Sequence, residues 1–531
     1  MQRWIRGLTA VLLVLITGCS VRKPPDSAPT ALSSATPAET RNDLTTAPTV
    51  SSTAAPTRNN VDPTGTPDTA GDDGPYEQGL IEAADDDVTT LTGATTYDLD
   101  VTISESYDTV TGQETIHYVN REDTNLEEIY FRLFPNVTGG AIRVSDVTVD
   151  GAGVTPALEY ADSALRVPLP HPLAPSDAIN VSLAFTVTVP QEMAGNYGLF
   201  GYFDDVLVLN RFYPVIPVYD DEGWNVEIPP RSGDLTHYDA SFYDVQVTAP
   251  AAMTPVASGI DMARETEDGW QTVRFTAGPA RDFYLAGSER FTLQSTTIGE
   301  TTVNSYVVDT YAGSADDALN VAVNALETYN VRFVPYPYTE FDVVSMPMLA
   351  LGIEYPGIIG IRLGLYDPDD EVSGTPTSVL LESVIVHEVA HQWFYNLVGN
   401  DEIDEPWLDE AVVQYATGLY YRDLYGESAE QGYRQSWINR WERIGREKIP
   451  IGLPSGAYEP EAYAPIVYGR GPLFIDSLAE TMGEPTFNAF MRNYVANHRW
   501  EVATAEDFRT QAEANCNCDL DPLFDEWVNP R

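Results

Sequence analysis

Two histidines separated by three residues constrain this chain more than any other feature of its sequence. They lie in residues 385–394, which read IVHEVAHQWF. On a helix, side chains four positions apart share one face, so the imidazoles of His387 and His391 can reach a single ion. Glu388, the residue after the first histidine, then projects toward a water molecule on that ion. The segment therefore predicts a helix that holds zinc.

A candidate third ligand lies at the start of the next predicted helix. Glu410 follows His391 by nineteen positions, in residues 407–411, WLDEA. A short loop can fold this helix back beside the first. Three protein ligands leave the fourth position of a zinc ion open for water, which is typical of catalytic rather than structural zinc. We therefore expect one zinc ion, held by His387, His391 and Glu410.

The residues before about 290 follow a β pattern. Alternating and β-branched runs begin near Thr96, and the first of them reads YDLDVTI. Similar runs recur at 114–119, 126–133, 179–189, 243–247, 271–276 and 282–286, separated by Gly, Pro and Asp. Short strands at this spacing predict an all-β saddle or sandwich domain over residues 90–290.

A different pattern begins after about residue 300. One strand-like run, 303–308, is followed by apolar residues at helical spacing between 318 and 326. Further helices are predicted over 378–397, 410–425, 435–446 and 471–482. At 531 residues the chain is long enough for two or three domains. We expect a multidomain protein with a mixed α/β domain over residues 300–531, which contains the metal-binding pattern.

The predicted zinc helix resembles that of a known family. Residues 386–394 are similar, almost residue for residue, to the zinc helix of the aminopeptidase N family of zinc metallopeptidases, gluzincins that include the leukotriene hydrolase relatives. The resemblance covers about residues 97–483. It implies an N-terminal β-saddle domain followed by a thermolysin-like catalytic domain. Because the chain ends about 120 residues after Glu410, we expect a short form without the large C-terminal helical domain of many members.

The resemblance also implies where the substrate's N-terminus is held. Residues 352–356, GIEYP, stand where the family has a Gly-x-Met-Glu-Asn strand, whose glutamate binds the free α-amino group. Gly352 and Glu354 are therefore the candidate substrate-binding residues. The chain departs from the family pattern at Ile353 and Tyr355, the residues on either side of Glu354.

A tyrosine segment of the family has a counterpart here as well. Residues 467–471 read VYGRG. The resemblance implies that Tyr468 is a catalytic residue whose phenol hydrogen-bonds the oxyanion of the tetrahedral intermediate. Glu388 is the other expected catalytic residue, the general base that takes a proton from the attacking water and returns it to the departing amine.

These residues predict an aminopeptidase acting on peptides with a free N-terminus. Two alternatives remain open. One is a zinc endopeptidase on the same fold, and the other is an inactive lipoprotein whose β domain binds a surface partner. Cleavage of matched free and N-acetylated peptides distinguishes all three.

The first nineteen residues predict export. A basic start precedes an apolar run over residues 8–16, which is too short to span a bilayer and is typical of a signal peptide. Residues 16–19, ITGC, resemble the bacterial lipoprotein box, so Cys19 is the expected lipidation site and residues 1–19 a lipoprotein signal peptide. Residues 20–78, rich in Thr, Ser, Pro and Ala, predict a disordered tether.

We therefore expect the protein in the cell envelope, exported and held by a lipid on the outer face of a bacterial membrane. The charge of the chain excludes nucleic acid as a partner. With 29 Lys and Arg against 80 Asp and Glu, the net charge of -51 repels the phosphates of nucleic acid.

Two cysteines lie near the C-terminus, Cys516 and Cys518. They can form a local disulfide, remain free thiols or serve as soft metal ligands.

Overall fold

The structure is a computed structural model that describes residues 75–193, 197–228, 230, 233 and 237–529. The predicted signal peptide, Cys19 and residues 20–74 of the predicted tether lie outside the described residues. The last residues of the predicted tether are described, and a short 3-10 helix, η1, spans Glu77–Gly79. Among the described residues, no helix is long and apolar enough to cross a membrane.

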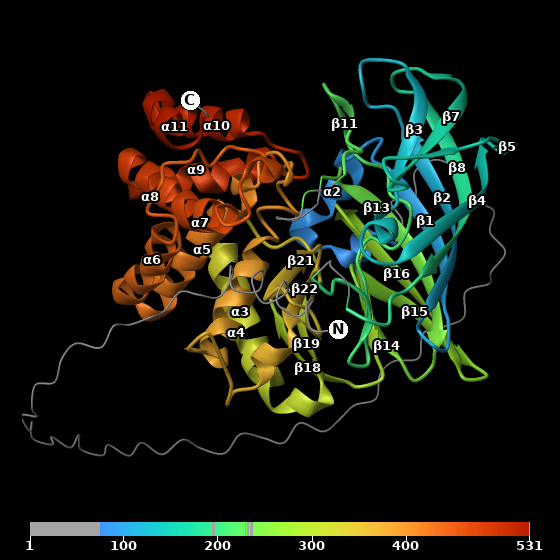
Figure 1. Ribbon diagram of the computed structural model, residues 1–531, viewed down its shortest axis with the longest axis horizontal. Helices are drawn as coiled ribbons and strands as arrows, with labels where there is room; N and C mark the ends of the chain where they lie inside the picture. Colours follow the sequence, from blue (N-terminus) through green and yellow to red (C-terminus); the bar gives the residue numbers. More distant parts are fainter. Residues whose placement is uncertain (1–74, 194–196, 229, 231–232, 234–236, 530–531) are drawn as a thin grey trace, which may run out of the picture. The chain divides into compact units, whose positions relative to one another are not determined.

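An eight-stranded sheet dominates the N-terminal half (Figure 1). Its strand order is β15-β16-β13-β1-β2-β8-β4-β5, and only β1 and β13 pair in parallel. The bounds are β1 Thr96–Ile103, β2 Thr109–Val119, β4 Ala141–Val149, β5 Ala152–Gly153, β8 Ala178–Thr188, β13 Ser241–Pro250, β15 Ile260–Glu267 and β16 Trp270–Ala280. In β1 and β2 buried and exposed side chains alternate, as expected for a sheet with one face on a core.

Besides the two-stranded pair of β11 Tyr219–Asp220 and β12 Gly223–Trp224, two smaller sheets complete this β domain. One has the order β3-β7-β6 and the other β14-β17-β10-β9. The bounds are β3 Leu126–Arg132, β6 Ala157–Glu159, β7 Ala164–Leu173, β9 Phe200–Phe203, β10 Val206–Leu209, β14 Thr254–Ala257 and β17 Leu285–Ser288. Fully buried residues of the large sheet, such as Val101, share one apolar core with Phe131 and Leu209 of the smaller sheets. The predicted all-β fold is confirmed.

The C-terminal half begins with a mixed five-stranded sheet. Its order is β18-β19-β20-β22-β21, with bounds β18 Phe291–Ile298, β19 Thr301–Val308, β20 Glu340–Met346, β21 Gly352–Tyr355 and β22 Ile358–Arg362. Helix α3 (Ala315–Arg332) connects the parallel strands β19 and β20. Strand β21 is therefore an edge strand, antiparallel to β22. An edge next to helices is a suitable place for a strand that meets a substrate.

Apart from the two-stranded pair of β23 Glu371–Val372 and β24 Thr375–Pro376, the remaining elements of this domain are helices. The predicted α/β architecture is confirmed. Figure 1 shows these helices in yellow to red. They are α4 Thr377–Ala390, α5 Trp407–Tyr425, α6 Glu427–Glu442, α7 Tyr463–Pro465, α8 Gly471–Met482, α9 Glu484–Asn497, α10 Ala505–Cys516 and α11 Asp521–Trp527. Between α7 and α8 the chain forms a π-helix, η7, over Ile466–Arg470.

The predicted helix over 378–397 ends early, at Ala390. The backbone N–H of Asn396 bonds the carbonyl of His391, and that of Leu397 bonds Gln392, each five residues back instead of four. Tyr395, the residue before Asn396, has a φ of 135°, outside the helical region. The chain therefore leaves the helix directly after the second histidine.

A buried arginine of the β domain bonds the segment that follows this helix. Arg281 follows β16 and is 1% exposed. Its guanidinium donates to the carbonyls of Asn396 at 2.9 Å, Leu397 at 3.4 Å, Tyr238 at 3.0 Å and Glu501 at 2.6 Å. The buried guanidinium is thus satisfied by carbonyls, two of which belong to the segment that follows α4.

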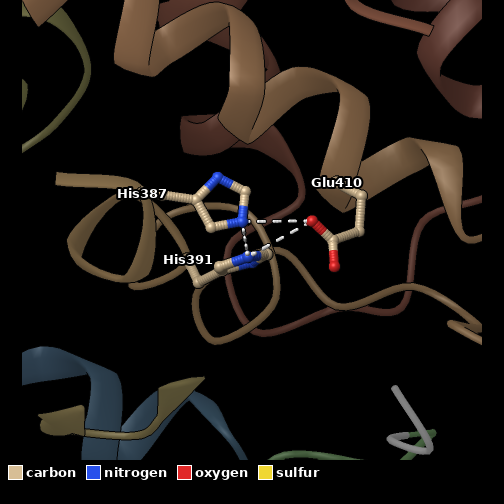
Figure 2. Close-up of side chains that lie close together, drawn as sticks. All are labelled: His387, His391 and Glu410. Carbon is tan, nitrogen blue, oxygen red and sulfur yellow. Dashed lines mark hydrogen bonds and ion pairs between the residues drawn. The ribbon is translucent and has the colours of Figure 1, made fainter. Parts of the chain in front are cut away.

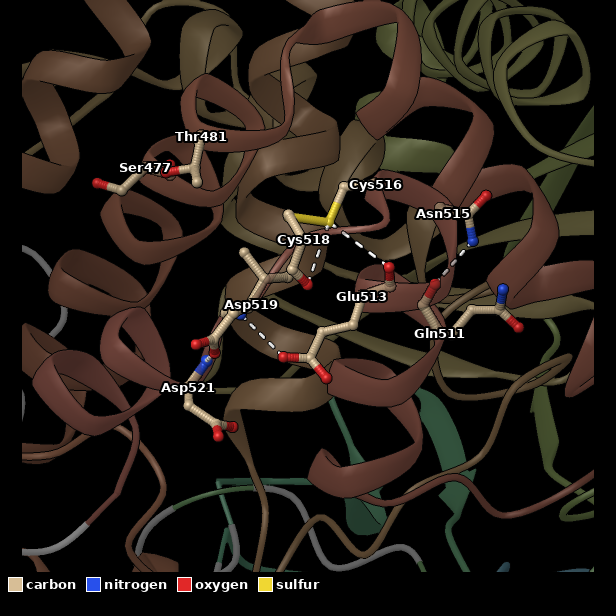
Figure 3. The surroundings of a disulfide bond; sticks show 10 residues. Ser477, Thr481, Gln511, Glu513, Asn515, Cys516, Cys518, Asp519 and Asp521 are labelled. Atoms are coloured by element: carbon tan, nitrogen blue, oxygen red, sulfur yellow. Dashed lines mark hydrogen bonds between the residues drawn. A yellow bond between two sulfur atoms is a disulfide. The ribbon is translucent and has the colours of Figure 1, made fainter.

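The two C-terminal cysteines form a disulfide (Figure 3). Cys516 is the last residue of α10, and Cys518 follows Asn517, which adopts the left-handed conformation at the end of that helix. Glu513 accepts a hydrogen bond from the backbone N–H of Leu520 at 2.8 Å, which holds the turn against the same helix. Of the three possibilities left open by the sequence, the structure has the local disulfide.

Candidate active site

The two histidines of the motif lie side by side near the end of α4 (Figure 2). Nε2 of His387 and Nε2 of His391 are 3.3 Å apart. The side chain of His391 is 1% exposed and that of His387 is 12% exposed. One helical turn therefore presents two nitrogen atoms to the same point, as their spacing predicts.

Glu410 completes this group from the first turn of α5 (Figure 2). Its Oε2 is 3.2 Å from Nε2 of His387 and 3.8 Å from Nε2 of His391. Two imidazole nitrogens and one carboxylate oxygen that converge in this way fit the ligand set of zinc with three protein ligands. The structure thus brings together the three residues predicted to hold the ion.

The protonation of the histidines also suits a metal. Burial lowers the pKa of His391 to about 4. Burial, followed by the nearby His391 and Arg440, lowers the pKa of His387 well below its usual range. Both imidazoles are therefore neutral at pH 7, as metal binding requires. Nδ1 of His391 lies 3.1 Å from the carbonyl of Phe394, so a proton on Nδ1 leaves Nε2 free to bind an ion.

Glu388 lies on α4 beside this ligand set and is 5% exposed. A Cβ added to Gly352, the first residue of β21, would lie 2.2 Å from Oε1 of Glu388. The absence of a side chain at Gly352 therefore makes room for the carboxylate of Glu388. This is a steric reason for the glycine that the resemblance alone did not provide.

Glu354 comes to the same place from β21. Its carboxylate, that of Glu388 and a ring nitrogen of His391 lie within 4.8 Å of one another. Glu354 is 5% exposed. The structure therefore places the candidate for binding the α-amino group directly beside the candidate base and a candidate metal ligand.

The two positions where β21 departs from the family pattern face away from this group. Ile353 and Tyr355 pack in an apolar core together with Tyr284, whose ring stacks on that of Tyr355 at 3.8 Å. Alternate residues of a strand point to opposite faces. Since Glu354 points to the site, the substitutions at Ile353 and Tyr355 change the core rather than the surroundings of the metal.

Tyr468 reaches the site from the π-helix η7. Its hydroxyl donates a hydrogen bond to Oε1 of Glu410, and its ring centroid is 6.3 Å from that of His387. π-Helical turns occur frequently at functional sites, where they redirect one side chain. The sequence indicated Tyr468 but not the π-helix, because no simple periodicity marks it.

Three side chains behind the ligands were not predicted from the sequence. Gln414 on α5 contacts His387, and Arg440 and Tyr433 of α6 contact Gln414. One signal was present, since Gln414 is one helical turn after Glu410 and so shares its face. The contribution of α6 had no such signal, because it depends on how two helices pack.

Known proteins resemble this chain in sequence. Residues 317–527 match the model of the peptidase family M1 domain. Aminopeptidase M1 of Arabidopsis thaliana is 26% identical over 233 residues, which are 41% of this chain and 26% of that protein. Aminopeptidase 2 of Candida albicans is 22% identical over 454 residues, 81% of this chain and 46% of that protein. The chain thus spans less than half the length of these curated relatives.

Solved structures show the same fold. An M1 zinc metallopeptidase of Deinococcus radiodurans, solved as a mutant bound to a Tyr-Ser-Ala substrate, has a TM-score of 0.61 and 20% identity, covering 82% of this chain and 94% of that chain. A two-domain M1 zinc metallopeptidase mutant bound to L-arginine also has a TM-score of 0.61 and 20% identity. Residues 317–527 therefore form a peptidase family M1 domain, and the aminopeptidase relatives agree with the resemblance of this chain to the aminopeptidase N-type gluzincins.

Proposed function

We propose that this chain is a zinc aminopeptidase that removes residues from the N-terminus of extracytoplasmic peptides. His387, His391 and Glu410 would hold the ion. When bound there, zinc lowers the pKa of a water molecule to about 7 and polarises the scissile carbonyl. The observation that carries the proposal is the position of Glu354, within 4.8 Å of both the candidate base and a candidate ligand.

Glu388 performs the proton transfers. Its carboxylate lies beside the ligand set in a buried position, where it can take a proton from the attacking water and return it to the departing amine. Tyr468, whose hydroxyl lies next to Glu410, can donate a hydrogen bond to the oxyanion that develops on the carbonyl.

Glu354 determines where the substrate is cut. A buried carboxylate pairs strongly with the α-ammonium group of a peptide. Because Glu354 is so close to Glu388, an ammonium group bound there brings the first peptide bond, rather than an internal one, to the base. An N-acetylated peptide has no such charge and loses this interaction.

The test uses a peptide of defined sequence in free and N-acetylated forms, with and without a metal chelator, and identifies products by mass spectrometry. Stepwise trimming of the free peptide alone, abolished by chelation, is the expected result. Internal cleavage of both forms would show an endopeptidase. No cleavage of either form by zinc-loaded protein would contradict enzymatic activity altogether.

We also propose that the protein is exported and lipid-anchored through Cys19 on the outer face of a bacterial membrane. The supporting observations are the lipoprotein-box sequence and the disulfide between Cys516 and Cys518, since disulfides persist in oxidising compartments outside the cytosol. Labelled fatty acid should enter the wild-type protein and not Cys19→Ser. Equal labelling of the two would overturn the anchor.

A further inference from the structure

A buried amide lies behind the candidate metal ligands. Gln414 is on α5, one turn after Glu410, and is 4% exposed. Its Nε2 is 3.2 Å from Nδ1 of His387, and the other ring nitrogen of His387, Nε2, faces the remaining ligands. A side chain in this position decides how the imidazole is oriented and which of its nitrogens carries the proton.

The opposite end of the same amide is held from α6. Oε1 of Gln414 accepts hydrogen bonds from Nη1 of Arg440 at 2.9 Å and from the hydroxyl of Tyr433 at 3.0 Å. A guanidinium can only donate, so the amide oxygen must face Arg440 and the amide nitrogen must face His387. The tyrosine hydroxyl can donate or accept, and it therefore suits either orientation of the amide.

His387 requires the other orientation when its Nε2 binds an ion. The proton of the imidazole is then on Nδ1, and this N–H needs an acceptor. Gln414 supplies that acceptor only if Oε1 turns toward His387, and in that orientation its NH₂ group meets the guanidinium of Arg440. Arg440 is also bonded elsewhere, because the same Nη1 donates to the backbone carbonyl of Tyr468 at 3.1 Å.

We propose that Gln414 is the positioning residue for His387 and that its amide is shared between His387 and Arg440. Because Arg440 also bonds the backbone of Tyr468, it links the orientation of a metal ligand to the placement of that tyrosine. This inference rests on the proposed zinc site. It makes an unusual prediction, namely that a carboxylate at position 414 serves both partners better than the natural amide, because two carboxylate oxygens can accept from Arg440 and from Nδ1–H of His387 at once.

The test measures zinc affinity by competition with a chromophoric chelator, a readout that does not depend on peptidase activity. In Gln414→Met, which keeps the length of the side chain but cannot hydrogen-bond, zinc should bind about 10–100-fold more weakly. In Gln414→Glu it should bind at least as tightly as in the wild type. Gln435→Met, an exposed position on α6, is the matched control and should leave the affinity unchanged.

Each outcome bears on a separate claim. Wild-type protein that binds no zinc would refute the proposed function itself. Wild-type binding with an equal affinity in Gln414→Met, or with Gln414→Glu as weak as Gln414→Met, would overturn the positioning role alone. Thermal unfolding checks that the variants fold.

If Gln414→Met does not fold, Arg440→Met decides the question. Removing the guanidinium frees the amide to turn, so zinc affinity should be retained or increased, while kcat falls because the carbonyl of Tyr468 loses a donor. A loss of zinc affinity of about 10-fold or more in Arg440→Met would contradict the shared amide.

Discussion

A Cβ atom on Gly352 would lie 2.2 Å from Oε1 of Glu388, so strand β21 and the candidate base cannot both keep their positions if residue 352 has a side chain. The contact joins the edge of the sheet to the helix that carries the histidines. It explains why a glycine begins the strand that also carries Glu354.

Gly352→Ala should therefore displace Glu388 without removing any metal ligand. We expect kcat to fall about 10²-fold, the cost of moving a catalytic group by about 1 Å, while zinc remains bound. Steady-state kinetics and metal analysis measure the two effects. Gly313→Ala is a suitable control, because a Cβ there meets nothing within 4 Å. Equal kcat values in the two variants would show that the close approach has no role in catalysis.

Tyr468→Phe removes the hydroxyl next to Glu410 and keeps the ring. If that hydroxyl stabilises the oxyanion, kcat should fall about 10²–10³-fold with little change in KM, since the interaction forms in the transition state. Tyr425→Phe, which removes an exposed hydroxyl bonded to Glu382, provides the comparison. A rise in KM with unchanged kcat would instead assign Tyr468 to ground-state binding.

Glu354→Gln removes one negative charge from the position that would hold the substrate's α-ammonium group. The expected result is a loss of about 10–100-fold in kcat/KM for peptides with a free N-terminus, in line with the strength of a hydrogen bond to a charged group. N-acetylated peptides serve as the internal control, because they carry no ammonium group. An equal loss for both kinds of peptide would mean that Glu354 only supports the shape of the site.

A buried carboxyl group, that of Glu405, gives a pH dependence of stability. Burial, and then the charges of Asp401 and Asp404, raise the pKa of Glu405 from 4.5 to about 7, although the backbone N–H of Ala505 opposes this. The folded protein therefore binds this proton more tightly than the unfolded chain does. The stability it contributes is fully present below pH 4.5 and is lost as the pH rises toward 7.

Glu405→Gln, which keeps an acceptor for Ala505, should remove this fall. Denaturant unfolding at several pH values measures the unfolding free energy of the wild type and of the variant. The difference between the two, followed against pH, gives the contribution of Glu405. The exposed Glu371→Gln makes the same change of charge and should show the wild-type slope. A wild-type slope in Glu405→Gln would place the titration elsewhere.

Local periodicity accounts for the parts of the fold and site that the sequence predicted well. The histidine pair needs only one turn of helix, and the alternation in β1 and β2 appears directly as alternating burial. The end of α4 at Ala390 could not be predicted in this way, because no local pattern marks it and the segment that follows is bonded to the distant Arg281. The role of the Gln414 amide could not be predicted from local periodicity either, because its partner Arg440 lies on another helix.

The most direct test of the account is the ratio of kcat/KM for a free peptide to that for its N-acetylated form, measured with zinc-loaded protein. An aminopeptidase that binds the ammonium group through Glu354 should show a ratio of about 10² or more, with both activities abolished by chelation and restored by zinc. A ratio near one, with internal cleavage products, would contradict the account.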